Sequence, residues 1–545
     1  MKKISYIFGF ILILVFFIAP QLHLFFIPKF SDFTVIFVNE NTIKAIQNTL
    51  AISLSVSWFC LFLAVPLAWL LTRTDLPNKI NFRSWFCLPY TIPPFVGAIG
   101  WIILANPTSG ILSLWLNQAL GIKLNIYSFG GLVWVETSFL FTFMLLSTLA
   151  VLDKMDSSLE EAARLSGAGP ARVFTDITLP LLKPAIIKGF ILSFLATASS
   201  FGVPALIGGP ARLYMLTTQI YSFQRAGTSN GLQMAIAISA VLGITTLVLL
   251  YSSQLFWGVS KNYTVAGKTP RPSLLPLKKY KYPVVFVLSL LLFVIFILPL
   301  LGILLSALSP VQGSWSLSQL NLNNFIRVLF QTEETLRAIL QSFELAFGAA
   351  LFCTLFSFIF NYFIYRTKFV GRTFAAVAIS LPFSTPGTVL ALAFIISFSQ
   401  GIFGVGPSLY STLWLLAIAY IVKYCSLSFK VLGDAYQQIH PTLEEAAKIS
   451  GANWRQVMTT IYWPLLKPAL MASGFLVFMP VLSELTMTIL LTGPGLETIG
   501  TLIFQLQEYS DMGGGGASVL SCVVVFFVLI LNFALKTFSK GRYGL

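Results

Sequence analysis

EEAARLSGAGPARVFTDITLPLLKPAI, at residues 160–186, is followed 284 positions later by EEAAKISGANWRQVMTTIYWPLLKPAL, at residues 444–470. Sixteen of the 27 positions are identical without a gap. An ordinary polar loop, capped for its own stability, need not repeat in this way, so the stretch marks an internal repeat. Both copies are polar islands in a mostly apolar chain, and each lies between two long apolar runs.

Each copy predicts two short helices joined by a glycine turn. A capping box at the acidic end favours a helix start there, and acidic side chains suit the helix dipole. The pairs with this spacing are Ser158 with Glu161 and Thr442 with Glu445. Gly167 and Gly451 are expected to end the first helix, since glycine readily adopts the left-handed conformation. The second helix is expected to end at Pro180 and Pro464.

The combination of Glu-Ala-Ala, a glycine shortly after it and an apolar segment leading to proline resembles the cytoplasmic coupling motif of bacterial ABC importer permeases. In that family the short helix docks in a cleft of a separate ATPase subunit and transmits its closure to the membrane helices. The resemblance implies coupling motifs at 156–184 and 440–468. The coupling residues that it implies are Glu160, Glu161, Ala162 and Gly167, with Glu444, Glu445, Ala446 and Gly451.

The resemblance covers nearly the whole chain. FGVPALIGGPARLYMLTTQIY at 201–221 and ELTMTILLTGPGLETIGTLIF at 484–504 are similar to the fused branch of the family, in which one chain supplies both permease halves. That branch includes importers of iron(III), thiamine and aminoethylphosphonate. It implies iron(III) as the first expectation, with thiamine, aminoethylphosphonate or another small phosphorylated solute as alternatives.

The family resemblance also implies the assembly. One permease chain is expected to bind two copies of an ABC ATPase and a periplasmic or lipid-anchored substrate-binding protein. ATP and Mg would be bound by the ATPase, so no cofactor is expected in this chain. ATP-driven approach of the ATPases would move the coupling helices and rock the two helix bundles between inward-open and outward-open states.

Composition independently predicts an all-α polytopic membrane protein. The 545 residues are 57% hydrophobic and 10% charged, whereas a soluble domain carries about 25% charged residues. Long apolar runs cross a bilayer as helices, because every backbone polar group must be satisfied within the segment. The net charge is +15. The basic residues gather in short loops on one side, so the positive-inside rule explains this charge, and lipid rather than nucleic acid is the expected partner.

Twelve spans are predicted, six in each half, in a bacterial inner membrane. They lie near 4–28, 45–72, 84–106, 131–151, 185–208 and 232–257, and near 282–308, 338–365, 374–398, 409–431, 469–492 and 517–538. The predicted domains are residues 1–257 and 282–545, joined by a basic linker at 258–281. Because six is an even number, the repeat is parallel. With the N-terminus inside, the inner segments hold 26 of the 34 Lys and Arg residues, which places both termini and both motifs in the cytoplasm.

The sequence offers no catalytic constellation of its own. Gly267-Lys268-Thr269 resembles the end of a phosphate-binding loop, but Asn262 stands where the first glycine is required. Two histidines are too few for a His-based metal or catalytic cluster, and the five cysteines lie in apolar runs without a CxxC pair. The chain is therefore expected to hold no metal site and to be no enzyme.

Ionisable residues inside apolar spans mark candidate sites, because their burial is costly. Glu484, together with Ser199 and its own counterpart Ser200 in the first half, is predicted to line the translocation path. An acidic residue there would suit a cation. The alternative is that Glu484 holds a proline-kinked segment to a neighbouring helix. Three further charged residues are expected nearer to span ends, at the membrane interface: Glu136, Glu344 and Lys423.

Two other interpretations compete with the importer. A twelve-helix secondary transporter driven by an ion gradient would not need two Glu-Glu-Ala-Ala motifs, and it would usually carry more charge within the membrane. A structural membrane protein without transport would not need paired motifs either.

Overall fold

Apolar helices dominate the computed structural model, which describes residues 2–28, 30–256, 274–311, 313, 315, 317–368, 370–509 and 515–538. Among these residues, ten helices are long and apolar enough to cross a membrane, and two bent helix pairs raise the number to twelve. The predicted all-α polytopic fold, with six spans in each half, is confirmed. Residues 258–273 of the predicted linker, with Gly267-Lys268-Thr269, lie outside the described residues.

The two halves repeat the same order of helices. The first contains α1 (Lys2–Leu12), η1 (Ile13–Ile18), α2 (Ala19–Phe26), α3 (Phe30–Val38), α4 (Glu40–Arg73), α5 (Lys79–Cys87), η2 (Leu88–Thr91), α6 (Pro94–Ala105), α7 (Ile111–Leu120), α8 (Phe129–Leu152), α9 (Ser158–Leu165), α10 (Pro170–Val173), η3 (Phe174–Thr178), α11 (Leu179–Ala198), η4 (Pro204–Gly208), α12 (Leu216–Arg225) and α13 (Ser229–Phe256). The second contains α14 (Lys281–Leu292), η6 (Phe293–Ile297), α15 (Leu298–Leu308), α16 (Asn323–Phe330), α17 (Glu333–Arg366), α18 (Arg372–Ser384), α19 (Gly387–Phe398), α20 (Leu413–Gln438), α21 (Thr442–Ile449), α22 (Trp454–Val457), η8 (Met458–Tyr462), α23 (Trp463–Leu482), α24 (Thr488–Leu491), α25 (Ile499–Glu508) and α26 (Gly515–Phe538). In the first half α4, α8 and α11 pack against one another, and α17, α20 and α23 do so in the second.

The third span of each half is bent rather than straight. The segment Lys79–Thr91 meets α6 at 96°, and α18 meets α19 at 111°. The spans predicted at 84–106 and 374–398 are therefore present as bent helix pairs, and the sequence did not predict the bends. The bends fall at the matched segments LPYTIPPF and LPFSTPGT, where proline removes a backbone donor and restricts the residue before it.

The helix that follows each coupling motif runs through its proline. Residues Pro170–Ala198 form one span and Trp454–Leu482 form another, so the predicted helix ends at Pro180 and Pro464 are wrong. A π-helical turn, η3 or η8, precedes each of these prolines. This wider turn takes up the change of hydrogen-bond register, so the chain stays helical past the ring.

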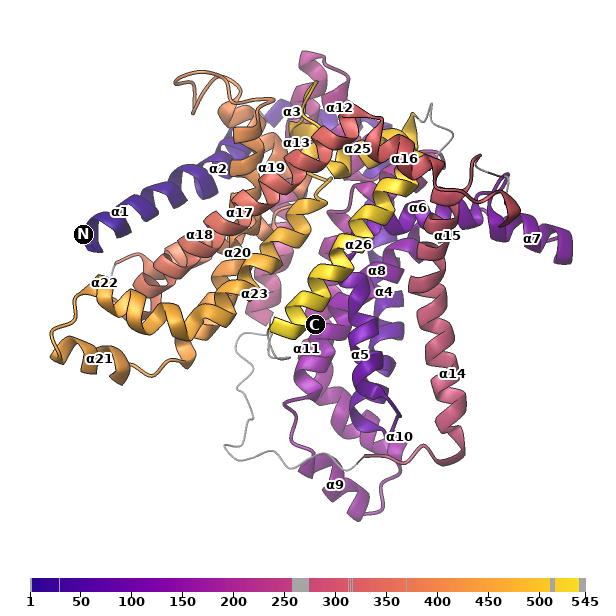
Figure 1. The fold of residues 1–545 in the computed structure, drawn as a ribbon, viewed down its shortest axis with the longest axis horizontal. Helices are drawn as coiled ribbons and strands as arrows, with labels where there is room; N and C mark the ends of the chain where they lie inside the picture. The colour runs from indigo at the N-terminus through magenta and orange to yellow at the C-terminus, as the bar shows by residue number, and fades with distance from the viewer. Residues whose placement is uncertain are drawn as a thin grey trace.

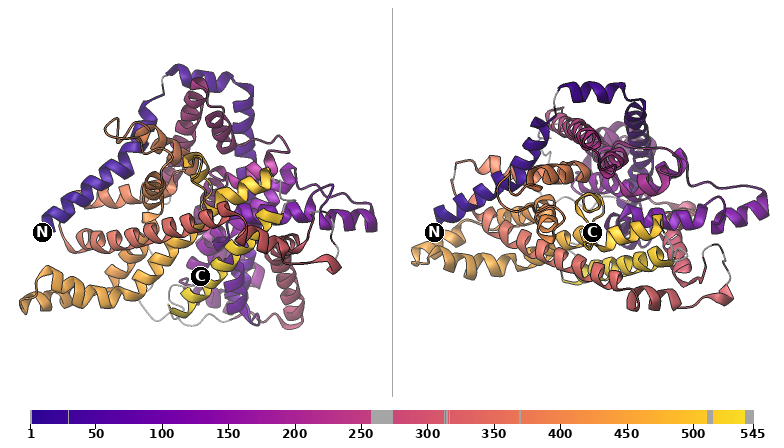
Figure 2. Two further views of the ribbon diagram at one scale, coloured as in Figure 1. Left: turned by 45° about the horizontal axis from the view of Figure 1, so that its top comes forward. Right: turned by 90° about the horizontal axis from the view of Figure 1, so that it is seen from above.

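The first helix of each half packs against the other half. Figures 1 and 2 show the N-terminal helix beside the second half, where α2 contacts α19 and η1 contacts α18. In return, α15 contacts α6 of the first half. The halves are thus interlocked, and the domain boundaries at 257 and 282 stay predictions about the sequence repeat.

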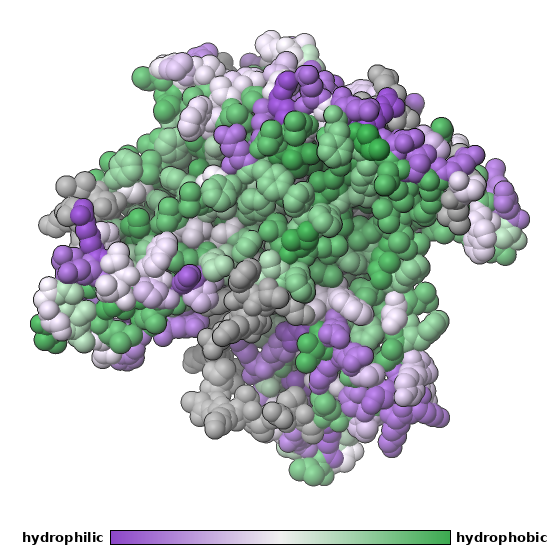
Figure 3. Space-filling model, in the orientation of Figure 1, coloured by the Kyte–Doolittle hydropathy of each residue, from purple (hydrophilic) through white to green (hydrophobic). Residues whose placement is uncertain are grey.

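An apolar belt crosses the molecular surface between polar ends, as Figure 3 shows. Large apolar side chains lie exposed on it, for example Phe62 on α4 and Phe347 on α17. Side chains of this kind suit lipid as their neighbour.

Candidate coupling helices and central cavity

The two repeated motifs form short helices at the same end of the molecule, labelled α9 and α21 in Figure 1. Gly167 and Gly451 follow them with φ of +85° and +82°, in the left-handed region. A side chain is strained in that region, so both glycines end their helices as predicted.

The helices begin differently from the prediction. Ser158 and Thr442 are the first residues inside the helices rather than N-caps, so the predicted capping boxes are absent from α9 and α21. Side chains two residues upstream take this role instead. The Ser158 backbone N–H donates to Asp156 Oδ1 at 2.9 Å, and that of Thr442 donates to His440 Nδ1 at 3.4 Å.

Glu160 faces the protein rather than solvent. Its carboxylate forms a 2.8 Å ion pair with Arg73, at the end of α4, and both side chains are about 3% exposed. The Thr178 hydroxyl donates to Glu160 Oε1 at 2.7 Å. The first acidic residue of the motif therefore ties α9 to α4 and to the start of the α11 span.

Glu444 forms the equivalent anchor in the second half with different partners. The Tyr362 hydroxyl donates to its Oε1 at 2.8 Å and the Tyr462 hydroxyl to its Oε2 at 2.6 Å. Lys448 forms a 2.6 Å ion pair with it. Arg366, the counterpart of Arg73, instead donates to two backbone carbonyls at the end of α20, those of Tyr436 in its last turn and Ile439 just after it.

The pKa of Glu444 reflects this environment. Burial tends to raise it, but hydrogen bonds from Lys448 and the two tyrosines outweigh burial and hold the pKa below its usual 4.5. A carboxyl whose pKa falls on folding stabilises the fold above its unfolded pKa, and this stabilisation is lost as the pH drops through the folded value. The anchor is therefore intact at neutral pH and weakens in acid.

The other predicted coupling residues point outward. Glu161 is half-buried and Glu445 is exposed. Four further residues of the prediction lie exposed on the same two segments: Ala162, Gly167, Ala446 and Gly451. Of the two consecutive glutamates in each motif, the first is therefore buried against the permease core, and the second is more exposed.

A central cavity of about 280 Å³ lies between the two halves. The predicted path residues Ser199, Ser200 and Glu484 all line it. Glu136 and Lys423 line it as well. The expectation that these two lie at the membrane interface is therefore wrong, because neighbouring helices of both halves cover them.

Glu484 is held in place by its surroundings. Lys423 forms a 2.8 Å ion pair with it. The backbone N–H groups of Met487 and Thr488 donate to the carboxylate at 3.1 and 3.0 Å, and the Thr488 hydroxyl donates at 2.6 Å. The carboxylate thus caps α24, just after the α23 span ends, while it lines the cavity.

The central cavity continues toward the coupling helices. A second cavity, of about 580 Å³, shares six lining residues with it: Tyr90, Thr91, Ala196, Lys423, Tyr424 and Pro480. The second cavity also reaches Asn81 and Ser84 on α5. Arg83 on α5 binds Asp153, just before α9, at 2.6 Å, so this cavity extends to the end of the molecule that carries the coupling helices.

Aromatic rings close the opposite side. Phe201 from the first half packs against Tyr221 and against Phe504 of the second half, with ring centroids 5.1 and 5.7 Å apart. Ser200 and Gly202, on either side of Phe201, line the central cavity. The three rings therefore separate this cavity from a pocket of about 770 Å³ on the far side, which Tyr221 and Phe504 also line.

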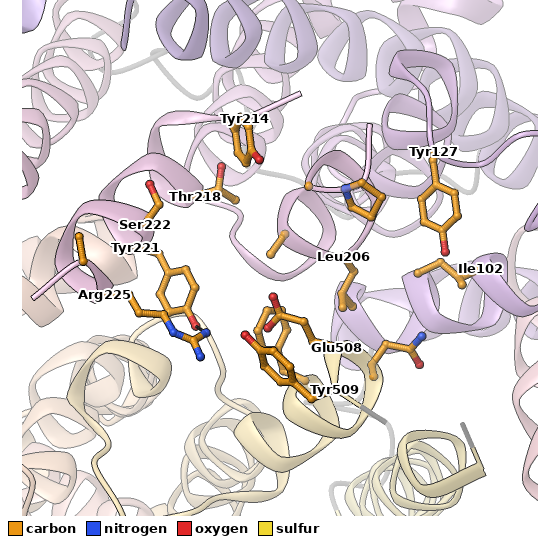
Figure 4. Close-up of a pocket in the computed structure, with 16 residues that line it drawn as sticks. Ile102, Tyr127, Leu206, Tyr214, Thr218, Tyr221, Ser222, Arg225, Glu508 and Tyr509 are labelled. Atoms are coloured by element: carbon orange, nitrogen blue, oxygen red, sulfur yellow. Dashed lines mark hydrogen bonds between the residues drawn. The ribbon is translucent and has the colours of Figure 1, made fainter. Parts of the chain in front are cut away.

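Figure 4 shows this outer pocket, with Tyr221 and Arg225 from the first half facing Glu508 and Tyr509 from the second. Arg225 donates to the Tyr221 hydroxyl at 2.7 Å, and its guanidinium carbon lies 5.5 Å from the centre of the Tyr509 ring. The outer pocket thus joins the two halves through one cation and two rings.

The family described as "Binding-protein-dependent transport system inner membrane component" matches residues 5–256 and 354–540, which is most of both halves. The chain belongs to this family. It is a multi-pass permease subunit of an ABC importer in the inner membrane, and the two matched regions agree with the two-repeat layout.

This permease resembles ferric permeases over most of its length. It is 25% identical to the ferric transport system permease protein FbpB of Actinobacillus pleuropneumoniae, over 86% of this chain and 67% of that protein. It is 25% identical to the Fe(3+)-transport system permease protein FbpB 2 of Haemophilus influenzae, over 91% and 90%. The molybdenum transport system permease protein ModB of Escherichia coli is 31% identical over 36% of this chain and 89% of its own.

Among solved structures, the permease is similar to a chain of a bacterial alginate ABC transporter, crystallised with an alginate-bound periplasmic protein. The identity is 20% and the TM-score 0.39, covering 49% of this chain and 98% of that one.

Sequence reasoning missed two groups of residues in this permease. Leu165 and Ile449, at matched positions in α9 and α21, are 90% and 88% exposed. An apolar residue on a short polar helix is a signal for a partner surface, and the repeat made it visible twice. Glu136 was misplaced because its position near a span end said nothing about which helices cover it.

Proposed function

We propose that this permease imports iron(III). The observation that carries the proposal is the length of the similarity: the ferric relatives match 86–91% of the chain, including both halves. The carboxylates that line the central cavity support a cation, since hard cations prefer oxygen ligands. Thiamine, aminoethylphosphonate or another small phosphorylated solute remain alternative substrates. Family membership removes the secondary transporter and the non-transporting structural protein as alternatives.

Two copies of an ABC ATPase are proposed to dock on α9 and α21 from the cytoplasm, where both termini also lie. The exposed Leu165 and Ile449 side chains would enter the ATPase clefts, because the repeat places an exposed apolar side chain at the same position of both short helices. ATP and Mg would be bound by the ATPase, and this chain would supply no catalytic group. A periplasmic or lipid-anchored binding protein would deliver substrate to the opposite face, at the outer pocket.

The anchors at Glu160 and Glu444 support a mechanism for coupling. Each ties a short helix to two core elements of its own half, so a push on the short helix moves that half as a unit. Nucleotide binding would then rotate the halves and close the cavity on the cytoplasmic side, while the Phe201 contact opens on the other. The arrangement of cavities suits an inward-open resting state.

The test is co-expression of the permease with its candidate ATPase and binding protein, followed by ATPase recovery and radioiron uptake. Leu165→Glu combined with Ile449→Glu is expected to lower ATPase recovery and uptake by about tenfold or more, because a charge must be buried in each apolar contact. Val370→Glu is the matched control, since Val370 is 93% exposed but lies outside α9 and α21.

Normal assembly and uptake in the double variant would contradict docking at these helices. A coupled complex that imports thiamine or a phosphonate but not iron would support the ATP-driven importer and contradict iron(III) as its substrate.

A further inference from the structure

The two halves place one carboxylate each beside the central cavity, but at different positions of the repeat. Counted with the offset of 284 residues that relates the coupling motifs, Glu136 on α8 corresponds to Tyr420 on α20. Glu484 corresponds in the same way to Ser200. This pair of positions therefore holds a glutamate and a serine in the first half, and a tyrosine and a glutamate in the second.

The second-half carboxylate, Glu484, is paired with several groups of the protein. Lys423 balances its charge, and the Thr488 hydroxyl donates to it. Tyr420 in turn lies 2.5 Å from the Thr488 hydroxyl. A carboxylate with this many partners has little left to offer a ligand.

The first-half carboxylate, Glu136, has different surroundings. Glu136 is 0% exposed, and within the described part of the chain neither of its oxygens receives a hydrogen bond. The Ser200 side chain lies close enough to act on it and offers a neutral hydroxyl. Phe139 stands where the second half has Lys423, so the repeat provides no matching cation. A buried carboxyl left in this way is costly, and the cost falls when a cation arrives.

We propose that Glu136 is the ligand that receives the cationic substrate in the central cavity, an assignment that rests on the proposed import of iron(III). The hydroxyls of Ser199 and Ser200 line the same cavity and supply further oxygen atoms of the kind that hard cations accept. The Lys423–Glu484 pair carries no net charge, so Glu136 decides the sign of the charge that the cavity favours.

The site is suited to brief binding of a cation during transport rather than to tight binding. Among the described residues, no group of three His, Cys, Asp or Glu side chains could hold a metal ion. One carboxylate with neutral hydroxyls binds a cation weakly enough to release it when the halves move. High affinity then belongs to the binding protein, and selection of a positive charge belongs to Glu136.

The test uses the complete complex of permease, ATPase and iron-loaded binding protein in proteoliposomes. Glu136→Gln keeps the size of the side chain but cannot release a proton to become a carboxylate when the cation arrives, and it is expected to lower radioiron uptake by about tenfold or more. Glu136→Asp restores the carboxylate and is expected to recover most of the uptake. Glu344→Gln is the matched control, because Glu344 lies on the α17 span with its side chain exposed.

A second measurement does not depend on transport. A hydrophobic carbodiimide modifies protonated carboxyl groups in apolar surroundings, and peptide mass spectrometry reports the modified residue. In the full chain in lipid nanodiscs, ferric nitrilotriacetate is expected to reduce labelling of Glu136 and to leave labelling of Glu344 unchanged. If the iron complex does not change the labelling of Glu136, the proposal is overturned, even where the Glu136→Gln variant fails to assemble.

The outcomes separate this inference from the proposed function. Iron uptake by Glu136→Gln at the wild-type rate would overturn the role of Glu136 and leave the iron importer intact. Thiamine uptake that depends on Glu136, without iron uptake, would support Glu136 as the ligand of a cationic substrate and contradict iron(III) as that substrate. Import of a phosphonate alone would overturn both.

Discussion

Glu160 and Glu444 stand at the same place in the repeat, yet their partners differ. Thr178 in the first half corresponds to Tyr462 in the second, and both hydroxyls donate to the glutamate. The first half adds a buried arginine, whereas the second adds another tyrosine and an exposed lysine. The first anchor therefore depends on an ion pair removed from water, and the second depends mainly on neutral donors.

This difference predicts unequal effects of mutation. Glu160→Leu leaves Arg73 buried without its partner and is expected to cost about 3–5 kcal/mol of stability. The double variant Arg73→Met/Glu160→Leu removes both charges and is expected to recover most of that loss. Thermal unfolding of the purified chain measures both, with Glu161→Leu as a nearby control at a half-buried site. Equal losses in the single and double variants would mean that the ion pair is not what holds α9.

At the scale of elements, α6 of the first half packs closely against α15 of the second half. A Cβ on Gly100 of α6 would lie 2.5 Å from the Pro299 carbonyl oxygen on α15. That oxygen belongs to the backbone and cannot turn away, so the two helices approach this closely because residue 100 has no side chain.

Gly100→Leu is therefore expected to force α6 and α15 apart and to destabilise the chain by about 1–3 kcal/mol. Gly130→Leu is the control, since a Cβ there meets nothing within 4 Å. Thermal unfolding in detergent compares the two, and an unchanged midpoint for Gly100→Leu would contradict the close packing.

The sequence predicted elements well and their shapes less well. Apolar length alone located the spans, and the glycines at 167 and 451 ended α9 and α21 as expected. The bends before α6 and α19 and the helical passage through Pro180 were not predicted. Proline removes one donor wherever it stands, and whether the chain breaks, bends or inserts a π-turn depends on which neighbours satisfy the freed carbonyl.

The residues of the candidate site were also predicted only in part. Ser199, Ser200 and Glu484 were found because polar residues are rare in apolar spans, and they do line one cavity. Glu136 and Lys423 carried the same signal but were placed at the interface. Their burial comes from packing between helices that are far apart in sequence, and a pattern of single residues does not report it.

At the scale of the whole molecule, the cavities define which side has access to the centre. Ser199→Cys is expected to react with a membrane-impermeant maleimide from the side of the coupling helices and not from the opposite side. The five native cysteines are a suitable background because four are buried and Cys522 is half-buried. Labelling of inside-out and right-side-out vesicles makes the comparison.

Phe201→Ala in the same background tests the aromatic contact. Loss of the ring removes its packing against Tyr221 and Phe504, so Ser199→Cys is expected to become reactive from both sides. Labelling of Ser199→Cys alone from the outer side would place the barrier elsewhere.

The exchange of first helices has a consequence for how the protein is made. The N-terminal span ends at Phe26, but the second-half surface that covers it, α18 against η1 and α19 against α2, begins at Arg372, about 350 residues later in synthesis. At roughly 5–20 residues per second, the ribosome needs on the order of 20 to 70 s to supply that surface. For this interval the nascent N-terminal helix sits in the bilayer without its neighbours from the second half, held by lipid or by the insertion machinery. Joining both halves in one polypeptide guarantees that the missing partner arrives from the same ribosome.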